Sequence, residues 1–135
     1  MSTRAHPQAE TPFEKRSREA LKKHKDKEIA KVLESKKKEA RMMLSKITPV
    51  LSSIEAIESL AEFSMLSPQL REPLMAKKEF LDTNAAAAAA IIASDDVGDL
   101  PAMASSSGVL EAIADAKKVV ARITNVLAAI ARLHH

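Results

Sequence analysis

The strongest constraint on the fold is an apolar repeat near the C-terminal end of the chain. Between residues 109 and 130, apolar side chains recur at alternating spacings of four and three residues, the a/d pattern of helices packed side by side. Further valine and leucine side chains widen this stripe on one flank, which favours a bundle with several neighbours over a two-stranded coiled coil. The predicted helix-packing seam consists of Val109, Ile113, Ala116, Val120, Ile123, Leu127 and Ile130.

The composition favours an all-α fold. The 135 residues include three Phe and no Trp or Tyr, so alanine, leucine, isoleucine and valine must supply the core. These side chains suit helix packing better than a broad sheet. Only two glycines are present, and hairpin turns that need a positive φ are therefore scarce. We predict one small helical bundle with a long, charged N-terminal helix extending from it.

Three prolines, each preceded by Ser or Thr, predict where helices begin. A hydroxyl side chain at the N-cap and a proline in the first turn are start signals, and both occur at Pro12, Pro49 and Pro68. We therefore expect a long helix from Pro12 to Pro49, a second helix from Pro49 and a third from Pro68. Pro73 should disturb the third helix, because proline lacks an N–H and clashes with the preceding turn.

An alanine run follows, and we expect it to form a separate helix. Thr83 or Asn84 can cap this helix, and the six alanines that come next have the highest helix propensity. Small side chains let backbones approach closely, so this helix should wedge between others; a low-complexity expansion without a role is the alternative. Residues 94–108 are rich in turn formers and are predicted to be a loop.

Charge is distributed unevenly along the chain. Residues 1–46 contain 14 Lys or Arg and seven Asp or Glu, a balance of +7, whereas residues 47–135 contain seven and 11, a balance of −4. In the second part, Glu55, Glu58 and Glu62 are expected on one helix face, which either is solvated or meets a basic partner. Residues 1–46 are thus basic, and residues 47–135 are mildly acidic.

The long N-terminal helix changes character along its length. Before residue 29 it is polar on all sides, whereas Ile29 and Val32 open an apolar stripe that we expect to pack into the bundle. The polar part should project from the bundle. The predicted organisation is a disordered tail at 1–11, a basic helical extension at 12–28 and a helical bundle at 29–135, with its loop at 94–108.

The residues that most catalytic and metal sites need are missing. Without cysteine there is no disulfide, thiolate ligand or cysteine nucleophile, and the two glycines form no phosphate-binding loop. The histidines are dispersed, and the neighbouring His134 and His135 point about 100° apart on a helix, which makes them a poor chelate; whether this pair is native stays open. Asp95, Asp96 and Asp99 lack the calcium-loop spacing, and Asp96 and Asp99 are predicted to be turn and solvation residues. We expect no enzyme, catalytic residue, cofactor or metal.

The leading functional hypothesis is a non-catalytic protein–protein interaction or scaffolding subunit of a larger assembly. Its basic helix would dock on an acidic protein surface, and apolar helix faces would be completed by a partner or by a second copy, with the seam at 109–130 as the expected place. The predicted partner-binding residues of the basic helix are Lys22, Lys23, Lys25, Lys27, Lys31, Lys36, Lys37, Lys38 and Arg41.

The alternative hypothesis is non-specific binding to the RNA or DNA backbone, in a ribonucleoprotein or chromatin complex. The same lysines could contact phosphates. Sequence-specific recognition is disfavoured because Lys outnumbers Arg and no aromatic side chain interleaves with the charges. No signal-peptide core and no apolar run of about 20 residues is present, so we expect an intracellular protein without a membrane span, in cytoplasm or nucleus, with an organelle left open.

Overall fold

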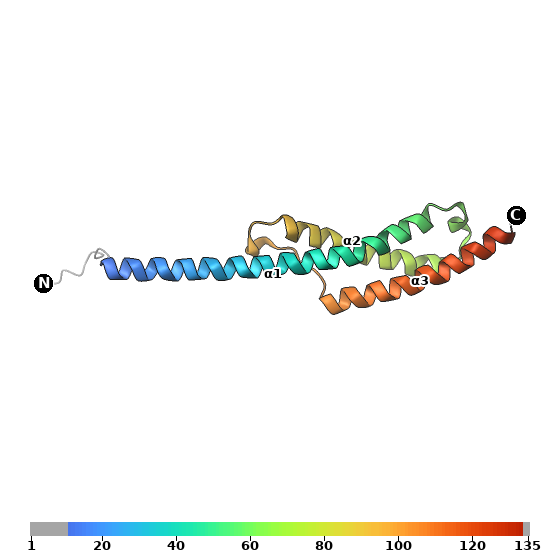
Figure 1. Ribbon diagram of the computed structural model, residues 1–135. Coiled ribbons are helices and arrows are strands. Elements are labelled where there is room, and N and C mark those ends of the chain that lie inside the picture. Colours follow the sequence, from blue (N-terminus) through green and yellow to red (C-terminus); the bar gives the residue numbers. More distant parts are fainter. Residues whose placement is uncertain (1–10, 134–135) are drawn as a thin grey trace.

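The chain is all-α, as predicted. The computed structural model describes residues 11–133, and these contain three α-helices and no strand (Figure 1). Two short 3-10 helices lie in the connections. The elements are α1 (Pro12–Glu58), η1 (Ala61–Met65), α2 (Pro68–Ala93), η2 (Val97–Asp99) and α3 (Ser106–Leu133).

The three helices form a bundle around one half of α1. This helix has 47 residues and is therefore about 70 Å long. The chain turns back at the end of α1, so that α2 runs antiparallel to it, and α3 then runs in the direction of α1 again (Figure 1). Each helix contacts the other two, whereas the N-terminal part of α1 extends beyond them.

All three helices contribute to the core. The largest fully buried side chains are Met43, Ile47 and Ile54 of α1, Leu74 and Leu81 of α2, and Val109 and Ile123 of α3. Where α1 leaves the bundle, a second and smaller cluster has Ala40, Ala88 and Ile91 buried, with Leu44, Ile92, Leu100 and Met103 packed against them. The long helix is therefore held along its C-terminal half by the main core and at its exit by this smaller cluster.

The predicted seam of α3 lies inside this bundle. Five of its seven residues are buried, and Val120 and Ile130 are half-buried against the same core. The seam packs on the chain's own helices, because α1 and α2 both contact α3. It is therefore not the free apolar surface on which we expected a partner or a second copy to dock.

The predicted break at Pro49 is wrong, because α1 continues through this residue to Glu58. A proline at this position leaves the carbonyl of Ser45 without its N–H partner, at a cost of about 3 kcal/mol. Both residues are exposed, so water can reach that carbonyl, and the ribbon bends in this C-terminal part (Figure 1). Burial of Ile47 and Val50 on either side keeps the chain helical.

The predicted boundaries in α2 and α3 also need correction. Pro68 begins α2 as expected, but the helix passes through Pro73 and through the expected cap at Thr83 and Asn84 without interruption. The alanine run is thus the second half of α2, with Ala88 buried against α1. The loop is shorter than predicted, since α3 begins at Ser106.

Replacing Pro49 with alanine should stabilise the protein. The Pro49→Ala change restores a backbone hydrogen bond and removes a steric clash, so we expect the free energy of unfolding to rise by about 1–3 kcal/mol in urea denaturation followed by circular dichroism. Pro68→Ala is the matched control, because proline at the first helical position has no such cost. A gain of the same size in the control would contradict this explanation.

Candidate functional site

The first candidate site is the projecting part of α1, here called the arm (residues 12–32). Thr11 caps it, with its Oγ1 accepting a hydrogen bond of 3.1 Å from the backbone N–H of Glu14. Every residue from 11 to 32 is exposed. The first fully buried residue of α1 is Ala40, so the arm is supported by its own backbone hydrogen bonds and by neighbouring side chains alone.

The bundle begins later along α1 than predicted. Ile29 and Val32 were expected to pack, yet they are 50% and 47% exposed. Leu21 is 63% exposed on the same side of the helix. These side chains are exposed because α2 and the connection that follows it extend along α1 only as far as Lys36 and Glu39. The apolar stripe of α1 therefore continues past the bundle with nothing of this chain to cover it.

The predicted basic residues do not form one patch. With 3.6 residues per turn, Lys22, Lys25 and Lys36 lie within about 50° of the line that continues the buried stripe. Lys37 lies on a flank and is half-buried. The others share the opposite, outer face of α1, within about 50° of its centre: these are Lys23, Lys27, Lys31, Lys38 and Arg41, and all are exposed.

Two of the predicted basic residues are held in local ion pairs. Lys31 Nζ lies 3.6 Å from Glu28 Oε1, and Arg41 Nη1 lies 3.4 Å from Glu34 Oε1. All four side chains are more than half exposed, and such surface pairs contribute little to stability. They leave the basic character of the outer face in place.

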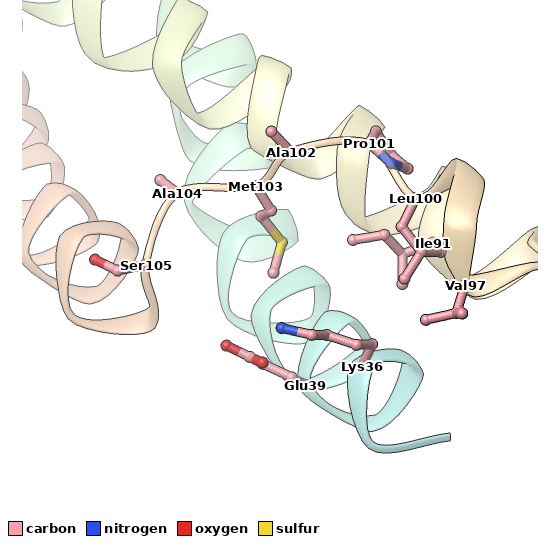
Figure 2. A pocket seen from close by; sticks show the side chains of 10 residues that line it. All are labelled: Lys36, Glu39, Ile91, Val97, Leu100, Pro101, Ala102, Met103, Ala104 and Ser105. Atoms are coloured by element: carbon pink, nitrogen blue, oxygen red, sulfur yellow. The ribbon is translucent and has the colours of Figure 1, made fainter. Parts of the chain in front are cut away.

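The second candidate site is a cleft where α1 passes the connection between α2 and α3 (Figure 2). It encloses about 430 Å³ and is lined by Lys36 and Glu39 of α1, Ile91 of α2, and Val97 and residues 100–105 of the connection. In Figure 2 the Met103 side chain points from the connection towards the two charged residues. Glu39 is already engaged, because Ser106 Oγ donates a 2.6 Å hydrogen bond to its Oε1.

A buried amide fixes the rim of this cleft. Asn84 is 5% exposed; its Nδ2 donates to the carbonyl of Phe80 at 2.9 Å, and its Oδ1 accepts from the N–H of Ala104 at 2.8 Å. The sequence pattern predicts Thr83 or Asn84 as a helix cap, whereas both lie inside α2. The signal that was missed is its spacing, since Asn84 falls between Leu81 and Ala88 on the apolar face of α2. A lone amide in such a stripe indicates a bridge to another segment.

The predicted acidic residues Glu55, Glu58 and Glu62 do not share one site, and Glu58 pairs with a lysine. Lys78 Nζ lies 2.8 Å from Glu58 Oε1, which joins α2 to the end of α1. The hydrogen bond to Glu58 raises the pKa of Lys78 above its ordinary value of 10.5, although burial opposes this. Glu55 is exposed, and Glu62 lies in η1, so the predicted acidic face is divided.

The predicted turn residues of the connection do form a turn. Asp96 Oδ1 accepts a 2.9 Å hydrogen bond from the N–H of Gly98 at the start of η2. Within residues 11–133, no three His, Cys, Asp or Glu side chains are grouped so that they could hold a metal ion. His24 is exposed on the arm, and the remaining histidines lie outside the described residues.

Comparisons with protein-family models, curated proteins and solved structures found no match for this chain. In the part of the chain that the structure describes, no helix combines the length and apolar character of a membrane span. The functional argument must therefore come from the arm and the bundle themselves.

Removing the buried amide should loosen the α2–α3 connection. In Asn84→Ala the N–H of Ala104 loses its partner, and we expect the free energy of unfolding to fall by about 1–3 kcal/mol, with faster hydrogen exchange at Ala104. Thr83→Ala, at the exposed neighbouring position, is the control. Equal stability of the two variants would show that the amide does not hold the connection.

The Lys78–Glu58 pair predicts a pH dependence. Because the pKa of Lys78 is higher in the folded protein than in the unfolded chain, its contribution to stability is complete below about 10.5 and is lost as the pH rises through the raised value. The free energy of unfolding of Lys78→Gln should therefore fall less steeply above pH 10.5 than that of the wild type. Lys117→Gln, at an exposed position on α3, is the control for the loss of one lysine side chain.

Proposed function

We propose that this chain is a non-catalytic interaction subunit that docks through its arm on an acidic protein surface in a larger assembly. The observation that carries the proposal is the exposure of every residue from 11 to 32 on a helix that continues without interruption from the bundle. No side chain of the bundle packs on this segment, so its faces are available for another molecule.

Energetics support a partner for the arm. An isolated helix of this length is marginally stable in water, and exposed ion pairs add only a few tenths of a kcal/mol each. The capped start at Thr11 and the anchored end in the bundle both help the helix to form. A docked partner would add the tertiary contacts that most protein helices depend on.

The side chains of the arm favour an acidic protein over a nucleic acid as its partner. Exposed Leu21, Ile29 and Val32 offer apolar area on the face that carries Lys22 and Lys25. Burying apolar side chains inside a rim of charge is typical of protein interfaces. A partner with an apolar strip bordered by carboxylates would satisfy both features.

Binding to a nucleic-acid backbone is the second candidate, and the outer face favours it. Arg16, Lys23, Lys27, Lys31 and Lys38 repeat along this face at helical spacing, and all five are exposed. A row of cations of this kind can neutralise phosphates without reading sequence. The two candidates therefore use opposite faces of one helix, which makes them separable by mutation.

Charge reversal on each face tests both candidates. Lys22→Glu with Lys25→Glu changes the inner face, and Lys23→Glu with Lys27→Glu makes the same change in charge on the outer face. Full-length protein is used to capture partners from its source, with and without nuclease. We expect a stoichiometric protein partner that survives nuclease treatment and is lost only with the inner-face variant.

Other outcomes of this experiment would contradict the proposed function. Binding that disappears with nuclease, high salt or the outer-face variant would establish the nucleic-acid candidate instead. Capture that neither variant reduces would show that the arm is not the docking element. Circular dichroism of both variants must match the wild type, so that a lost interaction is not a lost fold.

A further inference from the structure

The exposed inner face of the arm continues into the cleft at the base of the arm. Ile29 and Val32 lie on the line of the buried stripe of α1, and both are half-exposed. Lys36 follows on the same line, one turn after Val32, and it lines the cleft together with Ile91 and Met103 (Figure 2). The two candidate sites are therefore parts of one surface, and this surface is continuous with the packing of α1 in the bundle.

The cleft has apolar walls and one unpaired cation. Ile91 is buried, and Leu100 and Met103 are half-buried, with the Met103 side chain pointing towards Lys36 and Glu39 (Figure 2). Glu39 is engaged by a hydrogen bond from the start of α3. Within residues 11–133, Lys36 forms no ion pair. The cleft of about 430 Å³ therefore suits a large apolar side chain with a negatively polarised group beside it.

The other end of this surface is basic. Lys22 and Lys25 border the side of the arm on which Leu21 is exposed, and in the described part of the chain neither lysine forms an ion pair. From Leu21 to Lys36 the surface extends about 22 Å along α1, the length of a helix of about 15 residues. Glu14 lies two turns nearer the tip, outside this length. A helix that covers the surface therefore needs carboxylates at one end and apolar side chains at the other.

We propose that this surface binds an amphipathic helix of a partner protein, with acidic side chains in its first half and apolar side chains up to its end. The inference rests on the proposed function and states what kind of acidic surface the arm meets. The acidic half of the bound helix lies beside Lys22 and Lys25. Its apolar residues pack on Ile29 and Val32, and its last apolar side chain fills the cleft beside Lys36. An amphipathic helix that lays its apolar face into a groove is a recurring mode of recognition.

Three electrostatic effects favour a bound helix that runs parallel to α1. The bound helix then ends at the cleft, beside the start of α3, where Ser105 Oγ accepts a 3.1 Å hydrogen bond from the N–H of Gly108. The start of a helix is partially positive and its end partially negative, so the two helix ends attract each other. Lys36 can also donate hydrogen bonds to the last carbonyls of the bound helix. Acidic side chains in the first half of the bound helix are stabilised by its own dipole.

Two synthetic peptides with a fluorescent label test the helix and its direction on the full chain. The first has about 15 residues, with leucines at helical spacing, glutamates in its first half and a final phenylalanine. The second contains the same residues in reverse order, so its composition and amphipathic face are unchanged but its acidic half lies at the wrong end. We expect the first peptide to bind about tenfold more tightly in fluorescence anisotropy. It should also gain helix on binding in difference circular dichroism.

Single substitutions test the cleft separately from the arm. Lys36→Glu and Ala102→Glu each place a carboxylate at the cleft, at positions that are exposed, and each should weaken binding of the first peptide about tenfold. Lys38→Glu makes the same change in charge on the outer face and should leave binding unchanged. Equal affinities of the two peptides, or equal effects of Lys36→Glu and Lys38→Glu, overturn the inference.

Further outcomes distinguish this inference from the proposed function. If the full chain captures an acidic protein through Lys22 and Lys25 but binds neither peptide, the bound helix is wrong while the docking function stands. If Lys22→Glu with Lys25→Glu loses neither the first peptide nor the captured protein, both proposals are wrong. A wild-type dimer in light scattering that Lys36→Glu converts to a monomer would show that a second copy covers this surface, and the inference would be overturned.

Discussion

The burial of the C-terminal half of α1 is the interaction on which the rest of the structure depends. Met43, Ile47 and Ile54 are fully buried against α2 and α3, and they hold the helix in one orientation. Because backbone hydrogen bonds continue without a break into the arm, the same packing also sets the direction in which the arm projects. The position of every basic residue from Lys15 to Lys31 therefore follows from contacts made further along the helix.

The spacing of apolar residues predicted the all-α class of fold, whereas the signals of single prolines and caps misplaced some helix boundaries. The a/d repeat at 109–130 packs on the core as one helix face, because apolar residues at this spacing lie on the same side of a helix. The predicted helix break at Pro49 is wrong because the rule for proline considers the local backbone alone. In this protein Ile47 and Val50, on either side of Pro49, are buried in the core and keep the backbone helical. Tertiary burial can exceed a local cost of about 3 kcal/mol.

The candidate site was predicted only in part, for a physical reason. Helical spacing shows which residues share a face, so Ile29 and Val32 were correctly aligned with the buried stripe. Spacing along one helix cannot show where its neighbours end, and both residues are exposed because the bundle stops near Lys36. The same limit applies to Asn84, whose partner at Ala104 is 20 residues away in the sequence.

The narrow core at the exit of α1 has a mechanical consequence. At this point the helix is held by Ala40, Ala88 and Ile91, with Leu44, Ile92, Leu100 and Met103 partly buried against them. The arm beyond it acts as a lever about 32 Å long, and a tilt of about 10° at its base would move the tip by about 5 Å. Because Ala40 and Ala88 are fully buried, a larger side chain at either position would push α1 and α2 apart, and the arm would change direction without any change in its own surface.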